Sequence, residues 1–417
     1  MTTPSNLNVP AKDIPYFTPA QIPPAGTAAE SHRDEKTFPS LFHPLKIRGL
    51  EFQNRIFVSP MCQYSSENGK MTPWHLAHLG GIFTRGPGLT VVEATAVVPE
   101  GRISPEDAGL WSDDQIESHA QVVAFAHSQG QKIGIQLSHA GRKASTVAPW
   151  IEGSHLASED VGGWPDDVWA PSAIAYSSTY PQPKELSLEG IQRVVKAFED
   201  ATIRAIKAGY DVIEIHAAHG YLLHQFLSPA TNKRTDEYGG SFDSQVKLTL
   251  EVVDVIRRVI PADMPLFLRI SATDWLEESL PNESSWRSED TVKLAPILFA
   301  HGVDFLDVST AGLHSSQKIK GGPAYQAPFA EAVKKSLDPS LHSQFFVGSV
   351  GAISEARVAQ GVLDKGQADV VFVGRQFLKE PGLVWKFAEE LGVNIAAAKQ
   401  MGWPFKGRAK RTVARKA

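Results

Sequence analysis

The stretch at residues 213–229 reads IEIHAAHGYLLHQFLSP, and the pattern of the whole chain is easiest to follow from it. β-branched residues after Gly209 predict a buried strand that ends near His216. His216, His219 and Tyr221 then arrive within a few residues, beside a glycine. Imidazole donors next to a phenol are typical of a site that holds an oxygen atom and supplies a proton. The alternative is that these are ordinary loop residues. That interpretation suits any one of them taken alone, but it suits the whole cluster less well.

Seven further short apolar runs surround this strand in the sequence, and helical patterns alternate with them. The eight expected strands cover residues 55–59, 90–93, 132–137, 212–216, 266–270, 305–309, 345–347 and 370–373. Helical spacing is clearest at 188–208 and 243–259. This alternation predicts a closed eight-stranded (β/α)8 TIM barrel with its active site at the carboxyl ends of the strands. An open doubly wound sheet is the alternative, but no G-x-G-x-x-G follows the first strand.

Composition excludes several classes of protein. The 417 residues carry a net charge of −5, so no global basic field favours nucleic acid. The single cysteine, Cys62, cannot form an intramolecular disulfide and fits a reducing compartment. No secretory signal and no long apolar run are visible, so we expect a cytoplasmic protein without a membrane span.

The chain divides into three expected regions. Residues 1–37 form a proline-rich extension, which is either loose or laid over the body as a strap. Residues 38–403 form the barrel, and residues 404–417 form a basic tail. Two long insertions, 148–170 and 274–290, follow the third and fifth strands and should shape substrate access.

Candidate binding residues stand where the strands end. The first strand runs into Ser59-Pro60-Met61-Cys62-Gln63-Tyr64, whose small residues let backbone amides approach a planar ligand. Cys62 is either a functional thiol or a small buried hydrophobe. Ala94 leaves room for a flat ring, Gln136 can donate to and accept from a heterocycle edge, and Arg269 can offset negative charge.

The last two strands end in glycines and an arginine. Gly348 and Gly351 follow the seventh strand, and Gly374 with Arg375 follows the eighth. Glycines expose backbone amides, and an arginine can hold a phosphate through two parallel hydrogen bonds. Because these two loops form the usual phosphate site of such barrels, we expect a phosphate group here.

The stretch 213–229, together with Thr235-Asp236-Glu237-Tyr238-Gly239-Gly240-Ser241, resembles the Old Yellow Enzyme family of flavin-dependent ene-reductases. The resemblance runs from about residue 38 to residue 403 and is greatest for the subclass with a cysteine after the first strand, often called thermophilic-like. It implies an FMN-containing barrel that takes hydride from NADPH. The expected substrates are activated alkenes, namely α,β-unsaturated carbonyl or nitro compounds.

The resemblance also implies a role for each matching residue. The FMN-binding residues would be Ser59, Pro60, Met61, Cys62, Ala94, Gln136, Arg269, Gly348, Gly351, Gly374 and Arg375. Cys62 would also tune the flavin. His216 and His219 would hydrogen-bond the substrate's oxygen, Tyr221 would supply the proton, and Tyr64 would cover the substrate.

One motif departs from the family pattern. Members of the subclass often end in an Arg-Gly-Trp that reaches into a neighbouring subunit, whereas this chain reads Met401-Gly402-Trp403. The motif therefore does not distinguish a homodimer from another homo-oligomer, and it does not define the whole substrate pocket.

Three competing functions are weaker. A metal hydrolase could use His216 and His219, but no third ligand is evident at a strand end. A non-catalytic barrel leaves the joint presence of both histidines and Tyr221 unexplained. The dienoyl-CoA reductases of the family carry an iron–sulfur cluster, which a single cysteine cannot hold.

Overall fold

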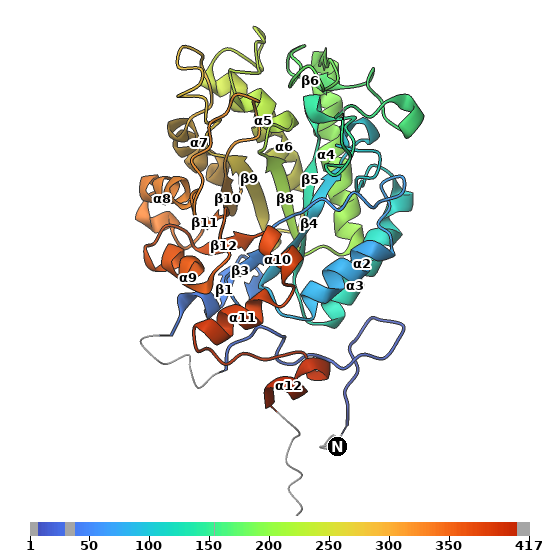
Figure 1. Cartoon of the computed structure of the whole chain (residues 1–417), viewed down its shortest axis with the longest axis vertical. Helices are drawn as coiled ribbons and strands as arrows, with labels where there is room; N and C mark the ends of the chain where they lie inside the picture. The colour runs from blue at the N-terminus through green and yellow to red at the C-terminus, as the bar shows by residue number, and fades with distance from the viewer. Residues whose placement is uncertain (1–6, 30–37, 154, 407–417) are drawn as a thin grey trace, which may run out of the picture.

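A computed structural model describes residues 7–29, 38–153 and 155–406 (Figure 1). Eight parallel strands close into a barrel in the order β10-β11-β12-β3-β4-β5-β8-β9. The strands are β3 (Ile56–Val58), β4 (Leu89–Ala96), β5 (Ile133–Ser138), β8 (Val212–Ala217), β9 (Leu266–Ser271), β10 (Phe305–Ser309), β11 (Phe346–Ser349) and β12 (Val370–Val373). The predicted TIM barrel is therefore confirmed.

The barrel strands are buried along their whole length because helices cover their outer surface (Figure 1). The main covering helices are α2 (Pro73–Phe83), α3 (Ile116–Ser128), α4 (Leu188–Ala208), α6 (Phe242–Val259), α7 (Ser288–Ala300), α8 (Ala327–Ser336) and α9 (Ala356–Asp364). The helix α4 begins where the Ser187 side chain accepts a hydrogen bond from the Gly190 amide at 3.0 Å. It ends at Gly209, whose left-handed φ of 95° stops the helix just before strand β8.

An antiparallel hairpin closes the amino-terminal end of the barrel. Its strands, β1 (Leu45–Ile47) and β2 (Leu50–Phe52), pack against the barrel interior in one apolar cluster. The rings of Phe52 and Phe57 lie 4.9 Å apart, and the Phe57 ring meets Phe372 edge-on at 5.5 Å. The interior at this end of the barrel is therefore filled with apolar side chains, whereas the predicted site residues lie toward the carboxyl ends of the strands.

The described part of the N-terminal extension, residues 7–29, lies along the body as a strap. The Gly26 amide donates to the Ala396 carbonyl at 2.9 Å, and the Ala396 amide donates back to the Thr27 carbonyl at 2.8 Å. The side chain of Asn54 also donates to the Gly26 carbonyl, at 3.2 Å. Ala25 is fully buried. Of the two arrangements left open by the sequence, the strap is the one observed.

The remaining elements are short. They are β6 (Trp169–Ala170), β7 (Lys184–Glu185), α5 (Leu222–Leu227), α10 (Arg375–Lys379), α11 (Leu383–Glu390) and α12 (Trp403–Lys406). Single 3-10 turns cover Ser40–Phe42, Pro99–Gly101, Asp113–Gln115, Gly141–Lys143, Glu159–Val161, Pro339–Leu341 and Lys399–Met401. In Figure 1, α5 and β6 lie at one end of the molecule and α12 lies at the other. Within the described ranges, no helix is long and apolar enough to cross a membrane.

Candidate active site

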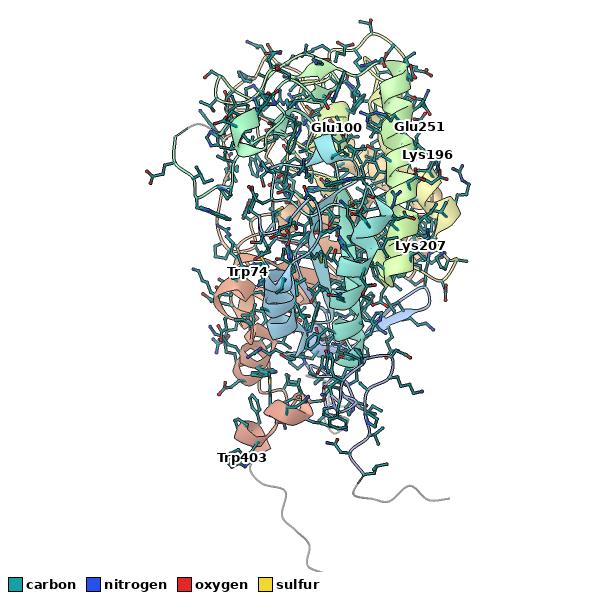
Figure 2. All side chains as sticks on the ribbon, turned by 90° about the vertical axis from the view of Figure 1, so that its right-hand side faces the viewer. Trp74, Glu100, Lys196, Lys207, Glu251 and Trp403 are labelled. Atoms are coloured by element: carbon teal, nitrogen blue, oxygen red, sulfur yellow. The ribbon has the colours of Figure 1, made fainter. Side chains whose placement is uncertain are left out.

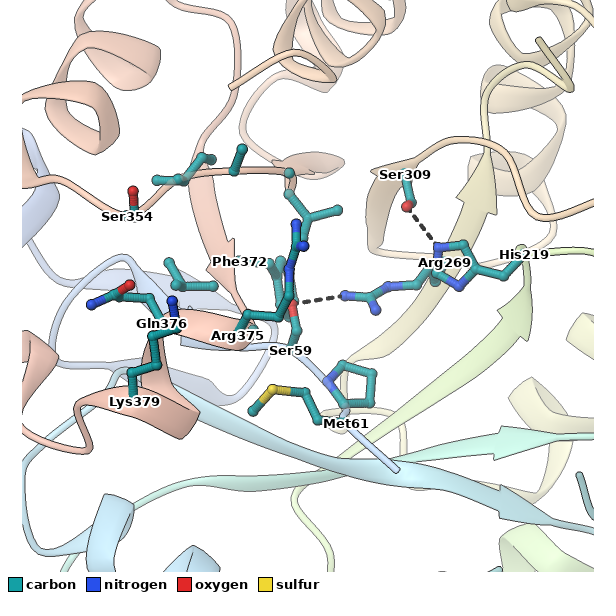
Figure 3. Close-up of a pocket in the computed structure, with 17 residues that line it drawn as sticks. Ser59, Met61, His219, Arg269, Ser309, Ser354, Phe372, Arg375, Gln376 and Lys379 are labelled. Carbon is teal, nitrogen blue, oxygen red and sulfur yellow. Dashed lines mark hydrogen bonds between the residues drawn. The ribbon is translucent and has the colours of Figure 1, made fainter. Parts of the chain in front are cut away.

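A cavity of about 430 Å³ opens at the carboxyl ends of strands β3, β8, β9, β10, β11 and β12 (Figure 3). Its volume is within the range of small-molecule and cofactor sites. Eight of the predicted residues border it together, namely Ser59, Pro60, Met61, His219, Arg269, Gly351, Gly374 and Arg375. Residues from distant parts of the sequence thus meet at the carboxyl face of the barrel, as its topology requires.

One end of the cavity is cationic. Arg375 and Lys379 belong to α10, and in Figure 3 Arg375 lies between Lys379 and Arg269. Among the described residues neither has a carboxylate partner, so both charges are available to an anion. Gly351 and Ala352 line the same end with positive φ angles of 115° and 49°, a backbone form that can turn amides toward an anion.

Gly348 was expected at this phosphate end, but it lies inside β11 and does not line the cavity. A β-carbon at this position would stand 2.7 Å from the ring of Phe305 and 3.1 Å from that of Phe372. The glycine therefore makes room for aromatic packing between neighbouring strands. No local sequence pattern indicates this packing, because both rings come from other strands.

Beneath the cavity, Arg269 lies between two buried carboxylates. Its guanidinium is hydrogen-bonded to Asp307, and its Nη2 also donates to the Ser59 hydroxyl at 3.3 Å (Figure 3). Glu214 Oε1 lies 3.9 Å from Arg269 Nε. Burial raises the pKa of both carboxyls, and the charge of Arg269 opposes that rise. The arginine is thus fixed at the floor of the cavity with its cationic face available to a ligand.

Gln136 is held by the same network. Its Nε2 donates to Glu214 Oε1 at 2.7 Å, and its side chain is buried. This bond fixes the orientation of the amide, leaving its oxygen free to accept and its second N–H free to donate. Ala94 lies buried in the adjacent strand β4, paired with Gln136 in register.

His216, His219 and Tyr221 form a tight cluster at the end of β8. The ring of His216 lies 5.2 Å from that of His219 and 4.9 Å from that of Tyr221, nearly perpendicular to both. The Ala218 amide donates to His216 Nδ1 at 3.3 Å, so the ring proton of His216 is on Nε2. His219 Nε2 lies 2.7 Å from the hydroxyl of Ser309.

The protonation states of these three groups suit donation to a ligand. Burial, followed by neighbouring positive charges, lowers the pKa of His216 and of His219 well below 6.5, so both rings are neutral at pH 7. Burial raises the pKa of Tyr221 well above 10, so its phenol keeps its proton. Each neutral imidazole offers one N–H, and the phenol can give up a proton only to a strongly basic atom.

Cys62 and Tyr64 lie together beside this cluster. Both side chains are half-buried, and burial raises the pKa of the Cys62 thiol well above 9. The Tyr64 ring meets Trp150 edge-on at 5.4 Å. Cys62 and Trp150 line a second, shallower cavity of about 390 Å³. The thiol is thus kept protonated, and an exposed tryptophan from the 148–170 insertion covers Tyr64.

Several residues at the site were missed in the sequence. Lys143 donates to the His219 carbonyl at 2.9 Å and to the Gly312 carbonyl at 2.8 Å. Its Nζ also lies 5.4 Å from the centre of the Tyr221 ring. Burial lowers the pKa of Lys143 to about 7. The only signal was its position at the end of the third strand. Ser309, at the end of β10, had the same signal.

The described residues contain no group of three or more His, Cys, Asp or Glu side chains that could hold a metal ion. The two histidines that a hydrolase would need are directed instead toward Ser309 and the Ala218 amide. The structure therefore gives the metal-hydrolase alternative no further support.

Comparisons with known proteins agree with this geometry. Residues 40–394 match the model of the NADH:flavin oxidoreductase / NADH oxidase family. The chain is 52% identical over 412 residues to a NADH:flavin oxidoreductase of Gibberella zeae, covering 97% of each protein. It is 41% identical over 367 residues to an NADPH dehydrogenase of Bacillus subtilis, covering 87% of this chain and 99% of that one.

Among solved structures, morphinone reductase superposes with a TM-score of 0.69 at 28% identity, covering 86% of this chain and 91% of the other. A morphinone reductase in complex with tetrahydroNAD gives the same TM-score at 26% identity, covering 85% of this chain and 92% of the other. The barrel, the convergent strand-end residues and these relatives lead to one conclusion: the chain is an oxidoreductase that belongs to the NADH:flavin oxidoreductase / NADH oxidase family, the Old Yellow Enzyme family.

Proposed function

We propose that this protein is an FMN-dependent ene-reductase that uses NADPH to reduce the C=C bond of α,β-unsaturated carbonyl or nitro compounds. The observation that carries the proposal is the cluster of two neutral imidazoles and one protonated phenol beside a cavity with a cationic end. The names of the relatives in Gibberella zeae and Bacillus subtilis agree with a nicotinamide and flavin chemistry.

The residues of the cavity fit FMN. Arg375 and Lys379 supply two cations that would bind its phosphate through charge-assisted hydrogen bonds. Arg269 presents a fixed positive charge at the cavity, and Gln136, which does not line the cavity but is bonded to Glu214 next to Arg269, would present a donor and an acceptor to a heterocycle edge. FMN held by these residues would supply the hydride chemistry that links NADPH to the β-carbon of the alkene.

The histidines orient and polarise the substrate. Because His216 and His219 are neutral, each can donate one hydrogen bond to the carbonyl or nitro oxygen. Donors aimed at an oxygen where negative charge develops lower the barrier most when they are fixed in advance. The Ala218 amide fixes the tautomer of His216, and Ser309 holds the ring of His219.

Tyr221 supplies the proton in this proposal. Hydride addition at the β-carbon leaves negative charge on the α-carbon, which is basic enough to take a proton from a phenol of raised pKa. The hydroxyl belongs to a ring packed against His216, so proton and oxygen donors act on neighbouring parts of one substrate.

We also propose that the chain belongs to the cysteine-bearing, thermophilic-like subclass, with Cys62 tuning the flavin and Tyr64 covering the substrate. The half-buried thiol and the pairing of Tyr64 with Trp150 support this proposal.

Replacing the thiol of Cys62 removes a polarisable neighbour of the flavin but little volume, so Cys62→Ala should retain FMN and shift its reduction potential. Potentiometric titration measures the shift. An unchanged potential in a badly destabilised variant would indicate a packing role instead.

A homo-oligomer in a reducing compartment such as the cytoplasm completes the proposal. Ile22, Trp403 and Phe405 are 78%, 65% and 56% exposed, with Trp403 at one end of the molecule (Figure 2), and an apolar cavity of about 750 Å³ lies between the strap and α11. Exposed apolar surface of this kind favours association. Sedimentation at several concentrations measures the assembly, and a monomer throughout would contradict it.

The function is tested with the purified holoprotein. The bound chromophore should be released as FMN, and NADPH oxidation under nitrogen should depend on an added enone, maleimide or nitroalkene, with the saturated product formed in equal amount. NADH in place of NADPH gives the nicotinamide preference. A protein that binds no flavin, or whose bound flavin reacts with none of these alkenes, would contradict the proposal.

A further inference from the structure

The loop that carries His219 and Tyr221 has an unusual backbone. His219 and Gly220 both have left-handed φ angles, 57° and 74°. A β-carbon on Gly220 would stand 2.1 Å from the Gly312 carbonyl oxygen, so only glycine fits there. The polar groups of such a turn need partners from outside the loop. The His219 amide donates to the Ser271 hydroxyl at 2.9 Å.

The partner of the Gly220 amide is a fully buried histidine, His224, on α5. Its Nδ1 accepts the Gly220 amide at 2.9 Å, and its Nε2 lies 2.9 Å from Asp274 Oδ1. A ring nitrogen that accepts from an amide carries no proton, so the proton is on Nε2 and is donated to Asp274. The ring is thereby fixed from both sides.

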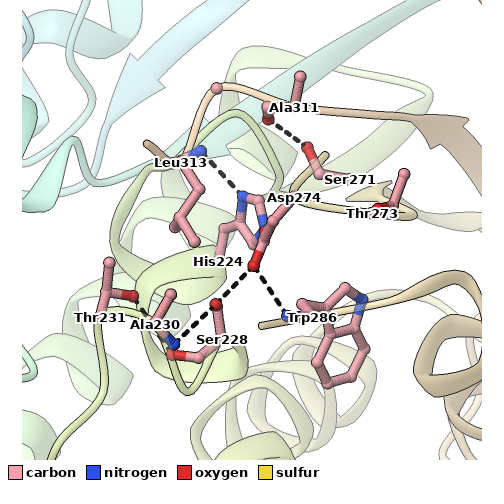
Figure 4. Close-up of polar contacts among 12 residues, drawn as sticks. His224, Ser228, Ala230, Thr231, Ser271, Thr273, Asp274, Trp286, Ala311 and Leu313 are labelled. Carbon is pink, nitrogen blue, oxygen red and sulfur yellow. Dashed lines mark hydrogen bonds and ion pairs between the residues drawn. The ribbon is translucent and has the colours of Figure 1, made fainter. Parts of the chain in front are cut away.

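Asp274 is itself immobilised. Its second oxygen accepts the Ser228 hydroxyl at 2.6 Å and the Trp286 amide at 2.8 Å, and its side chain is fully buried (Figure 4). Because Asp274 and Trp286 belong to the 274–290 insertion, the carboxylate joins that insertion to α5. The serine contacts the carboxylate and not the imidazole, so the three side chains are not arranged as a hydrolytic triad.

We infer that His224 and Asp274 are a positioning pair that holds the His219–Tyr221 turn in the geometry the reaction needs. Asp274 orients the imidazole, the imidazole holds the Gly220 amide, and Gly220 lies between the oxygen donor His219 and the proton donor Tyr221. Neither member of the pair lines the cavity. The expected change in reaction rate rests on the proposed function, but the expected change in the structure of the turn does not.

Two substitutions separate the two hydrogen bonds of His224. His224→Asn places an amide oxygen near the former Nδ1, where it can accept from Gly220 but cannot reach Asp274. His224→Gln reaches the former Nε2 position, where it can donate to Asp274 but offers nothing to Gly220. A misplacement of about 1 Å can cost about 100-fold in rate, so His224→Gln should slow flavin reoxidation by the alkene by about 10- to 100-fold. His224→Asn should stay within about threefold of the parent.

The matched control is His119, another fully buried histidine with two hydrogen bonds. It contacts the Tyr210 hydroxyl at 2.7 Å and the Gly109 carbonyl at 3.2 Å, away from the turn. His119→Gln should lower the melting temperature without slowing reoxidation. If it slows reoxidation as much as His224→Gln does, the effect is general destabilisation and the inference is wrong.

A second readout does not depend on catalysis. Hydrogen exchange of a peptide spanning 217–223 should be faster in His224→Gln than in the parent, and parental in His224→Asn. Asp274→Asn, which removes the charge and keeps the shape, should give a smaller change in the same direction, and it replaces His224→Gln if that variant does not fold. Unchanged exchange in all variants would overturn the inference. A parent that reduces no alkene would contradict the proposed function, and exchange would still decide whether the pair positions the turn.

Discussion

Arg375 is the residue whose role depends least on the rest of the site. It lines the cationic end of the cavity, and among the described residues no carboxylate competes for its charge. Charge-assisted contacts are worth roughly 1.5–3 kcal/mol, so Arg375→Ala should weaken FMN binding by about 10- to 100-fold or more. Fluorescence titration of the apoprotein measures the affinity. Arg357→Ala, at an exposed position on α9, is the control, and equal affinity in Arg375→Ala and the parent would remove the phosphate role.

Asp107 gives a residue-scale prediction about pH. It is 3% exposed, accepts the Ile103 amide at 2.7 Å, and burial raises its pKa from 3.8 to about 7. Between those two values the folded protein binds a proton that the unfolded chain lacks. The stabilisation from Asp107 is therefore complete below about pH 4 and is lost as the pH rises through about 7.

The side chain in Asp107→Asn cannot ionise, so the variant does not lose this stabilisation as the pH rises. The melting temperature of the variant minus that of the parent should therefore increase between pH 5 and pH 8. Parallel thermal unfolding at four pH values measures this difference. Asp113→Asn is the control, since Arg204 and Lys207 lower the pKa of that exposed carboxyl and its titration lies below this range. A difference between Asp107→Asn and the parent that is constant with pH would contradict the assignment.

At the scale of elements, the strap carries the clearest prediction. Residues 26–29 share backbone hydrogen bonds with residues 394–396. Each of three such bonds contributes about 1 kcal/mol, and the burial of Ala25 adds to this. Removal of residues 1–29 should therefore lower the free energy of unfolding by roughly 3 kcal/mol or more. Urea unfolding measures the loss. Removal of residues 1–16, most of whose described members are exposed, is the control, and equal stability of both truncations would contradict the prediction.

The secondary-structure elements also show how much of the structure could be predicted from the sequence. All eight barrel strands were predicted to within a few residues, because each is a short, mostly apolar run that is buried on both faces. The strand-end positions of Arg269 and Arg375 followed from this topology. Gly348 was misplaced, and His224 with Asp274 was missed. Their partners come from other strands and loops, and no local pattern records such contacts.

At the scale of the whole molecule, the apolar packing that closes the barrel and the residues of the candidate site lie at opposite ends of the strands. The hairpin of β1 and β2 fills the amino-terminal end with apolar side chains, so the carboxyl end can hold buried charges and strained turns. In the proposed reaction, the oxygen and proton donors come from the end of β8 and the turn that follows it, and β12 leads into the cationic end of the cavity. A single site of this kind should run two successive half-reactions, first with NADPH and then with the alkene.

The most direct test separates these two half-reactions in Tyr221→Phe. Flavin reduction needs only hydride, whereas alkene reduction also needs the proton, and a positioned acid contributes about 10²–10⁴-fold. The account predicts that NADPH reduces the flavin of Tyr221→Phe at nearly the parental rate in anaerobic stopped flow. Reoxidation by cyclohexenone should slow by about 100-fold or more. If Tyr221→Phe slows both half-reactions alike, or neither, Tyr221 is not the proton donor.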